Sequence, residues 1–125
     1  MERTIMIDGR KVKFKATGLT PALYRQHHQR ELFDDIGMLQ AEQAKAAAEN
    51  KGMSGEALQA FERMAFTMAK QADPEETPDN MEEWLDSFGF LSIYRALPDI
   101  VALWNLNEVT KSESKKKAPA KRRER

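Results

Sequence analysis

Apolar and polar residues alternate over residues 4–16, on both sides of the dipeptide Asp8-Gly9. Asp-Gly tolerates the positive φ angles of a two-residue type I′ turn, so the alternation predicts a β-hairpin in which Ile5 lies opposite Val12. One face of this hairpin is apolar, and the other face carries Lys11 and Lys13. The apolar face consists of Ile5, Ile7, Val12 and Phe14. Because a lone hairpin is marginally stable in water, we expect this face to pack on helices or on another chain.

A long helix is predicted from Pro21 to about Ala48, with Thr20 as its hydroxyl N-cap. Its first half has an apolar stripe at helical spacing. The stripe comprises Leu23, Tyr24, His27, Leu32, Phe33, Ile36 and Leu39. Its second half, residues 41–50, is alanine and charge, which favours a helix but leaves little to bury. We therefore expect this half to project, to fray or to act as an arm that faces a partner.

A second helix is predicted from Gly55 to Ala72, where Asp73-Pro74 ends it. Its apolar positions keep helical spacing. They are Leu58, Phe61, Ala65, Met68 and Ala72.

Two further helices are predicted from capping patterns. Asp79 and Glu82 have the spacing of a capping box, which would open a short helix that Gly89 closes. Ser92 would cap the last helix, which runs to Asn105 and which Pro98 should kink or divide after Ala96. The fold class is thus predominantly α with an N-terminal β-hairpin, a small α+β protein of about four helices packed with the hairpin. We expect one globular domain over residues 1–107, with its helical part at 20–107, and a disordered tail at 108–125.

Composition narrows the classes of protein. The chain has 125 residues and no cysteine, which excludes disulfides and thiolate chemistry and suits a reducing compartment. It has no apolar run of about 20 residues and no secretory signal, so we expect neither a membrane span nor export. The net charge of zero is unevenly divided, because residues 111–125 hold eight Lys/Arg and two Glu and leave residues 1–110 acidic.

No catalytic constellation is found. His27 and His28 are adjacent and would point about 100° apart on a helix, so we expect one to face the core and one the solvent. The pairs Asp34-Asp35, Glu75-Glu76 and Glu82-Glu83 are neighbours rather than opposed carboxylates, and we interpret them as solvated or capping residues. There is no serine elbow and no phosphate-binding glycine loop. We expect no enzyme activity, no cofactor and no metal site.

Apolar residues are concentrated in residues 66–107, which hold both tryptophans and three of the five prolines. Together with a set of methionines, this segment indicates a helical platform that binds a partner, since methionine-rich faces adapt to varied surfaces. The methionines are Met38, Met53, Met64, Met68 and Met81. The alternative is ordinary packing in a small core.

The tail offers a second interpretation. Lys115-Lys116-Lys117 and the cluster 121–125 are suited to contacts with nucleic-acid phosphates. No aromatic residue is interleaved for base stacking, and a solubilising tail or a contact with an acidic protein fits as well. A small nucleic-acid-associated or structural adaptor is the alternative function.

An ordered set of short motifs resembles the tail assembly chaperones of long-tailed bacteriophages and prophages. In the C-terminal half these are the residues 68–74, Thr77-Pro78, residues 82–88, Ile93-Tyr94, Leu97-Pro98 and Leu103-Trp104. In the N-terminal half they are the hairpin with its Asp-Gly turn, residues 13–17 and the helix start Thr-Pro-Ala-Leu-Tyr-Arg. The resemblance covers about residues 4–107, and it rests on the order of the motifs because none of them is an active site.

The resemblance implies a role in virion morphogenesis. Such chaperones bind the helical, apolar tape measure protein, keep it soluble and help recruit tail tube subunits, in the host bacterial cytoplasm and without entering the mature virion. Many also have a longer form made by ribosomal frameshifting, for which codons of the lysine run 115–117 are a candidate site. Expected partners are the tape measure protein and the tail tube protein, with self-association, and neither membrane nor nucleic acid. The residues predicted to form an adaptable partner-binding groove are Phe61, Met64, Met68, Trp84, Phe88, Tyr94 and Trp104. Whether Trp84 and Trp104 face the partner or the core is left open.

Overall fold

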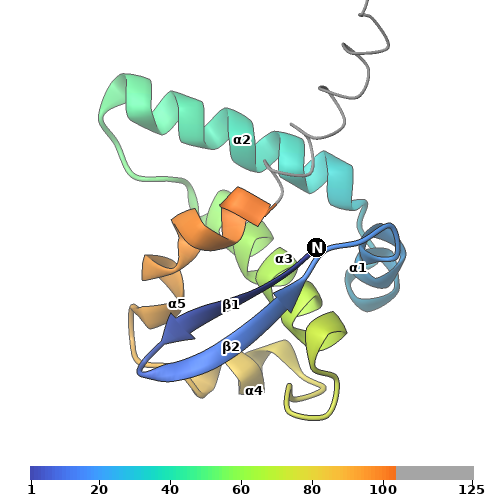
Figure 1. The fold of residues 1–125 in the computed structure, drawn as a ribbon. Coiled ribbons are helices and arrows are strands. Elements are labelled where there is room, and N and C mark those ends of the chain that lie inside the picture. Colours follow the sequence, from blue (N-terminus) through green and yellow to red (C-terminus); the bar gives the residue numbers. More distant parts are fainter. Residues whose placement is uncertain (104–125) are drawn as a thin grey trace, which may run out of the picture.

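The computed structural model describes residues 1–103 as a β-hairpin packed with a set of helices (Figure 1). This arrangement confirms the predicted fold class of a small α+β protein. The elements in chain order are β1 (Glu2–Ile7), β2 (Arg10–Lys15), α1 (Thr20–His28), α2 (Leu32–Glu49), α3 (Gly55–Ala72), α4 (Met81–Asp86) and α5 (Ser92–Arg95). The predicted end of the last helix at Asn105, Trp104 and the tail at 108–125 lie outside the described residues.

The hairpin has the predicted turn and register. Asp8 and Gly9 adopt φ angles of 57° and 76°, and Ile5 pairs with Val12. The face that carries Phe14 is turned inward, and this ring is fully buried. Lys11 and Lys13 on the other face are exposed. The hairpin therefore contributes one wall of the core, as the sequence pattern required.

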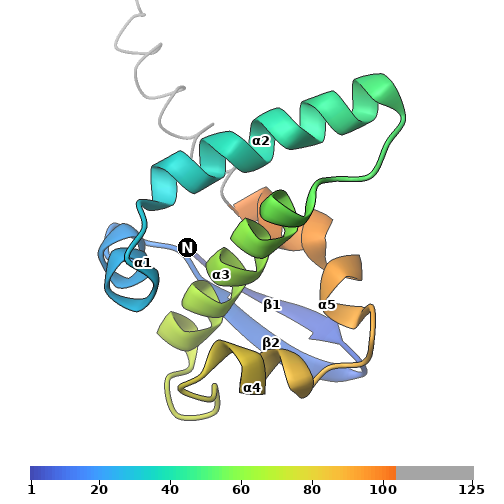
Figure 2. The same cartoon turned by 180° about the vertical axis from the view of Figure 1, so that it is seen from behind.

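The predicted long helix is in fact two helices. Gln29 adopts the left-handed conformation at φ 54°, and the chain then turns before α2 begins at Leu32. The Thr20 hydroxyl is not the N-cap, because it lies inside α1, accepts from the Thr17 amide at 2.8 Å and donates to Gln71 at 2.7 Å. The break turns α2 back across α3 (Figures 1 and 2). No residue of α2 after Leu39 is buried, in agreement with the projecting half that alanine and charge predicted.

Helix α3 has the predicted bounds and lies at the centre of the fold. Ser54 caps it by accepting from the Ala57 amide at 3.1 Å. The hairpin packs against one side of α3, and α1 and α2 cross another (Figure 2). Residues 64–69 are all buried, so the covered surface is much wider than the predicted stripe. A helix that is surrounded on several sides needs small residues between large ones, and Ala57, Ala60, Ala65 and Ala69 provide them.

The caps of the last helices differ from those predicted. Asn80, not Asp79, caps α4 by accepting from the Glu83 amide at 3.0 Å, while Asp79 pairs with Lys70. Glu82 is exposed and lies in the first turn of α4. Likewise, Leu91 occupies the N-cap position of α5, and the Ser92 hydroxyl donates to Asp8 instead. The division at Pro98 is confirmed, because α5 ends before Ala96 and the chain is helical again over residues 97–103.

Candidate functional site

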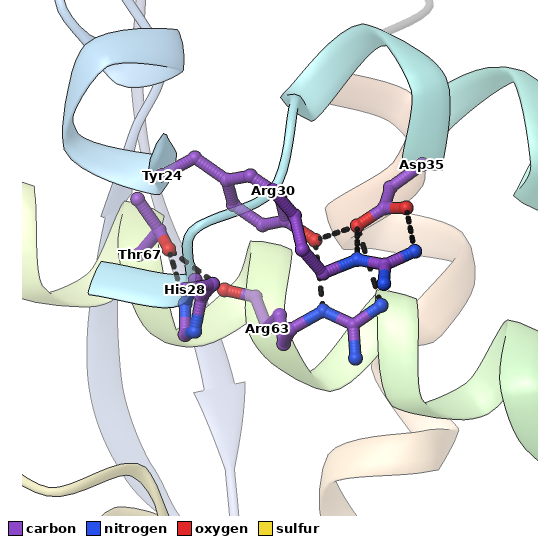
Figure 3. A network of polar contacts seen from close by, with 6 residues as sticks. All are labelled: Tyr24, His28, Arg30, Asp35, Arg63 and Thr67. Carbon is purple, nitrogen blue, oxygen red and sulfur yellow. Dashed lines mark hydrogen bonds and ion pairs between the residues drawn. The ribbon is translucent and has the colours of Figure 1, made fainter. Parts of the chain in front are cut away.

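A network of polar side chains joins α1, α2 and α3 (Figure 3). The buried carboxylate of Asp35 accepts from the Tyr24 hydroxyl, from Arg30 at 2.7 and 2.9 Å, and from Arg63 at 3.2 Å. The Arg63 Nε also donates to the Tyr24 hydroxyl at 3.1 Å. Asp35 was predicted to be solvated, and this is wrong: its side chain is 2% exposed, whereas Asp34 beside it is exposed.

His28 extends this network toward α3. Its Nε2 lies 3.1 Å from the Thr67 hydroxyl, which donates its own hydrogen to the Arg63 carbonyl at 2.8 Å. Because that hydroxyl has one hydrogen, His28 must be the donor in their bond. His28 is half-buried and His27 is exposed, so one histidine faces the core and one the solvent as expected. The inclusion of His27 in the predicted apolar stripe is wrong, because His28 is the histidine that α1 turns toward α3.

The protonation states follow from these contacts. The hydrogen bonds from Arg30 are the largest cause that lowers the pKa of Asp35, to about 2. Burial, followed by the hydrogen bond to Asp35, raises the pKa of Tyr24. Burial lowers the pKa of His28 to about 4, with smaller contributions from His27 and Arg63. Near neutral pH the network thus holds one carboxylate, two arginines and two neutral rings.

This network is suited to fixing helices and not to chemistry. The Asp35 lone pairs are taken up by three side chains, so the carboxylate has little capacity to accept a substrate proton. A surface hollow of about 560 Å³ lies over the turn between α1 and α2, and its two arginines are already bound to carboxylates. It is lined by Arg25, Gln29, Arg30, Glu31, Asp34 and Asp35. Within residues 1–103, no group of three or more metal-ligating side chains is placed to hold an ion.

The predicted partner-binding residues are mostly in the core. Five of the seven are buried, with exposed fractions of 0 to 8%, and therefore do not form an open groove. These five are Phe61, Met64, Met68, Trp84 and Phe88. Trp84 packs edge-on against Phe14 and Phe88, so the open question for this tryptophan is resolved in favour of the core. Tyr94 is half-buried and its hydroxyl donates to Glu62, while Trp104 lies outside the described residues.

A different apolar feature is exposed, in the turn between α4 and α5. Phe90 is 92% exposed and Leu91 is 47% exposed. Their turn is closed by the Ser92 amide, which donates to the Gly89 carbonyl at 3.1 Å. Sequence reasoning missed this pair because the apolar residues that flank Phe90 and Leu91, Phe88 and Ile93, belong to the core, and the sequence does not distinguish the four residues.

Asp8 holds this turn from the hairpin. Its carboxylate accepts from the Gly89 amide at 2.7 Å and from the Ser92 hydroxyl, one on each side of Phe90-Leu91. The hydrogen bond from Ser92, followed by the one from Gly89, lowers the pKa of Asp8, so this carboxylate stays ionised at neutral pH. Arg10 adds a second link, with its guanidinium 4.4 Å from the centre of the Phe88 ring and a 2.8 Å bond to Ser87. The two residues are therefore displayed on a turn that is fixed at both ends.

No protein-family model, curated protein or solved structure matches this chain. Among the described residues, no helix has the length and apolar character needed to cross a membrane.

Proposed function

We propose that the protein is a tail assembly chaperone of a long-tailed bacteriophage or prophage. It binds the tape measure protein, prevents its aggregation and helps recruit tail tube subunits. It acts in the host bacterial cytoplasm without catalysis, and it is not retained in the mature virion. The ordered motifs of residues 4–107 support this proposal through their resemblance to that family.

The structural observation that carries the proposal is the exposed turn Phe90-Leu91. A large aromatic side chain in full contact with water is unfavourable for the isolated protein, and such residues are common anchors in interfaces. Because Asp8 fixes the turn at both ends, little conformational entropy is lost when a partner covers it. A fixed apolar projection on a folded platform is what a chaperone for an apolar helix requires.

The remaining apolar residues of the predicted groove support the platform. Phe61, Met64 and Met68 are buried residues in the central part of α3. Trp84 joins α4 to the hairpin through its contact with Phe14. One small contact of this kind binds weakly. Many copies bound along one long tape measure protein would still shield it, because each copy covers a short stretch of that protein reversibly.

The test is co-expression with the long coiled-coil reading frame next to this gene. The tape measure product should become soluble and co-purify with the chaperone, and Phe90→Ala should reduce the recovered amount several-fold. A chain that ends at residue 110 should retain the effect, which separates the chaperone from an adaptor that acts through its basic tail. If the wild-type chain leaves the tape measure product insoluble, or if purified particles contain the chain in stoichiometric amounts, the proposal is wrong.

A further inference from the structure

The outer face of the hairpin carries cations that have no partner. Five other cations are in ion pairs, namely Arg25, Arg30, Lys51, Arg63 and Lys70. Within residues 1–103, the cations that make no hydrogen bond, ion pair or ring contact are Arg3, Lys11, Lys13, Lys15, Lys45 and Arg95. Four of these six are on the hairpin, and Arg95 lies at the end of α5 close enough to influence the Asp8 carboxylate. Most of these cations are therefore on the hairpin, while residues 1–110 as a whole are acidic.

Exposed apolar side chains lie close in sequence to the two turns that Asp8 joins. Met6 pairs with Lys11 on the outer face of the hairpin and is 60% exposed. The hairpin turn and the α4–α5 turn lie side by side, as Figures 1 and 2 both show and as the Asp8 bonds require. We call Met6, Lys11, Lys13, Phe90, Leu91 and Arg95 the hairpin-tip surface. It combines a fixed aromatic projection with aliphatic neighbours and a border of unpaired cations.

We infer that the hairpin-tip surface binds an amphipathic helix whose apolar face is bordered by carboxylates. This inference rests on the proposed function, and it names the chemical class of tape measure segment that the chaperone recognises. Phe90, Leu91 and Met6 would contact the apolar face of that helix. Lys11, Lys13 and Arg95 would face its acidic border, where opposite charges speed encounter and fix the orientation of the helix.

The composition of the surface favours a helix over a nucleic acid. Binding of single strands uses several aromatic rings on which successive bases stack. Here Phe90 is the single highly exposed ring of the surface, and its neighbours Leu91 and Met6 are aliphatic. A nucleic acid would also gain from positive charge without a nearby carboxylate, whereas Asp8 places a carboxylate between the hairpin turn and the α4–α5 turn.

The inference is tested with two fluorescent peptides that share one leucine-rich helical face. One peptide has glutamates along its borders and the other has lysines. The variants are Phe90→Ala and the double change Lys11→Glu with Lys13→Glu. Their matched controls are Phe33→Ala, at a ring 64% exposed at the start of α2, and Lys45→Glu, at an exposed lysine in the outer half of α2. Circular dichroism confirms that each variant is folded.

We expect the wild-type chain to bind the glutamate peptide about tenfold or more tightly than the lysine peptide at low salt, with the difference shrinking at high salt. Each hairpin-tip variant should lose about tenfold in affinity for the glutamate peptide, and the controls should stay within about twofold. Equal binding of the two peptides, or wild-type affinity in both hairpin-tip variants, would overturn the inference. Tighter binding of a single-stranded DNA of similar length would overturn it in favour of nucleic acid.

The two proposals fail in different ways. If the tape measure protein is solubilised equally by the wild-type chain and by both hairpin-tip variants, the chaperone function stands and the surface is wrong. If the glutamate peptide binds as expected but the tape measure protein stays insoluble, the surface exists and the proposed function is wrong.

Discussion

The Asp35 carboxylate is bound by three side chains from separate parts of the chain: Tyr24 in α1, Arg30 in the link to α2, and Arg63 in α3. Its neighbour Asp34 has the same chemistry and the same helical propensity but is exposed. Nothing local distinguishes the two residues. The distinction arises because α2 presents one of them to α3, where an arginine is available, and the sequence pattern alone does not contain that contact.

At this scale, Asp35→Ala should destabilise the protein strongly. Removing the carboxylate leaves the largely buried Arg63 and the Tyr24 hydroxyl without their acceptor, and breaking a buried charge network from one side costs about 3–5 kcal/mol. Urea unfolding at neutral pH measures the loss. Asp34→Ala is the matched control and should cost less than about 1 kcal/mol, as an exposed residue in the first turn of a helix.

The pH dependence of this difference provides an internal check. The folded-state pKa of Asp35 is about 2, below the ordinary aspartate value of 3.8. A lowered pKa means that the network stabilises the fold fully above about pH 4 and progressively less as the pH falls toward 2. The gap between wild-type and Asp35→Ala proteins should therefore narrow over that window. A gap that is constant with pH would mean that packing, not charge, explains the loss.

At the scale of the elements, the main feature that the hydrophobic pattern did not predict is the break between α1 and α2. In one continuous helix, residues 24 and 35 would be separated by about 16 Å along the axis. The left-handed Gln29 reverses the chain and brings Tyr24 into hydrogen-bond contact with Asp35. Periodicity predicted helix on both sides correctly, but no glycine or proline marked the break. The tertiary contacts stabilise a conformation that glutamine disfavours by itself.

The break predicts opposite effects for two similar substitutions. Gln29→Gly should raise the free energy of unfolding by about 0.5–1 kcal/mol, because glycine adopts the left-handed region without steric cost. Gln26→Gly, inside α1, should lower it by about 1 kcal/mol, because glycine is a poor helix former. Both are measured by urea unfolding. Two losses of similar size would show that residue 29 is helical in solution.

In the whole molecule, hairpin and helices share one core. Phe14 of β2 is fully buried and packs edge-on against Trp84 of α4, with ring centres 6.5 Å apart. Asp8 and Arg10 tie the hairpin turn to the α4–α5 turn about eighty residues later in the chain. The hairpin is therefore expected to unfold with the helices and not before them.

Phe14→Ala should cost about 3–5 kcal/mol, the usual range for truncating a fully buried phenylalanine. Far-UV circular dichroism and tryptophan fluorescence should report one coincident transition for both the wild-type protein and this variant. Lys13→Ala, on the exposed face of the same strand, should change stability by less than about 0.5 kcal/mol. Separate transitions for the two probes would contradict a single cooperative domain.

The prediction of an open partner-binding groove was wrong because most of its residues are buried within the molecule. An amphipathic pattern shows that a face is removed from water, and it does not show whether the same chain or a partner covers it. Phe61, Met64 and Met68 have the spacing of a binding face, and the hairpin and the other helices of the same chain cover them.

The sequence by itself determined the local structure. The Asp8-Gly9 turn and its register, the bounds of α3 and the division at Pro98 follow from backbone preferences and short-range periodicity, which act within a few residues. Only the tertiary structure decided which apolar residues are buried and which polar ones are joined. Long-range packing placed Asp35 inside, Trp84 in the core and Phe90 in solvent, because each outcome depends on what other elements bring beside the residue.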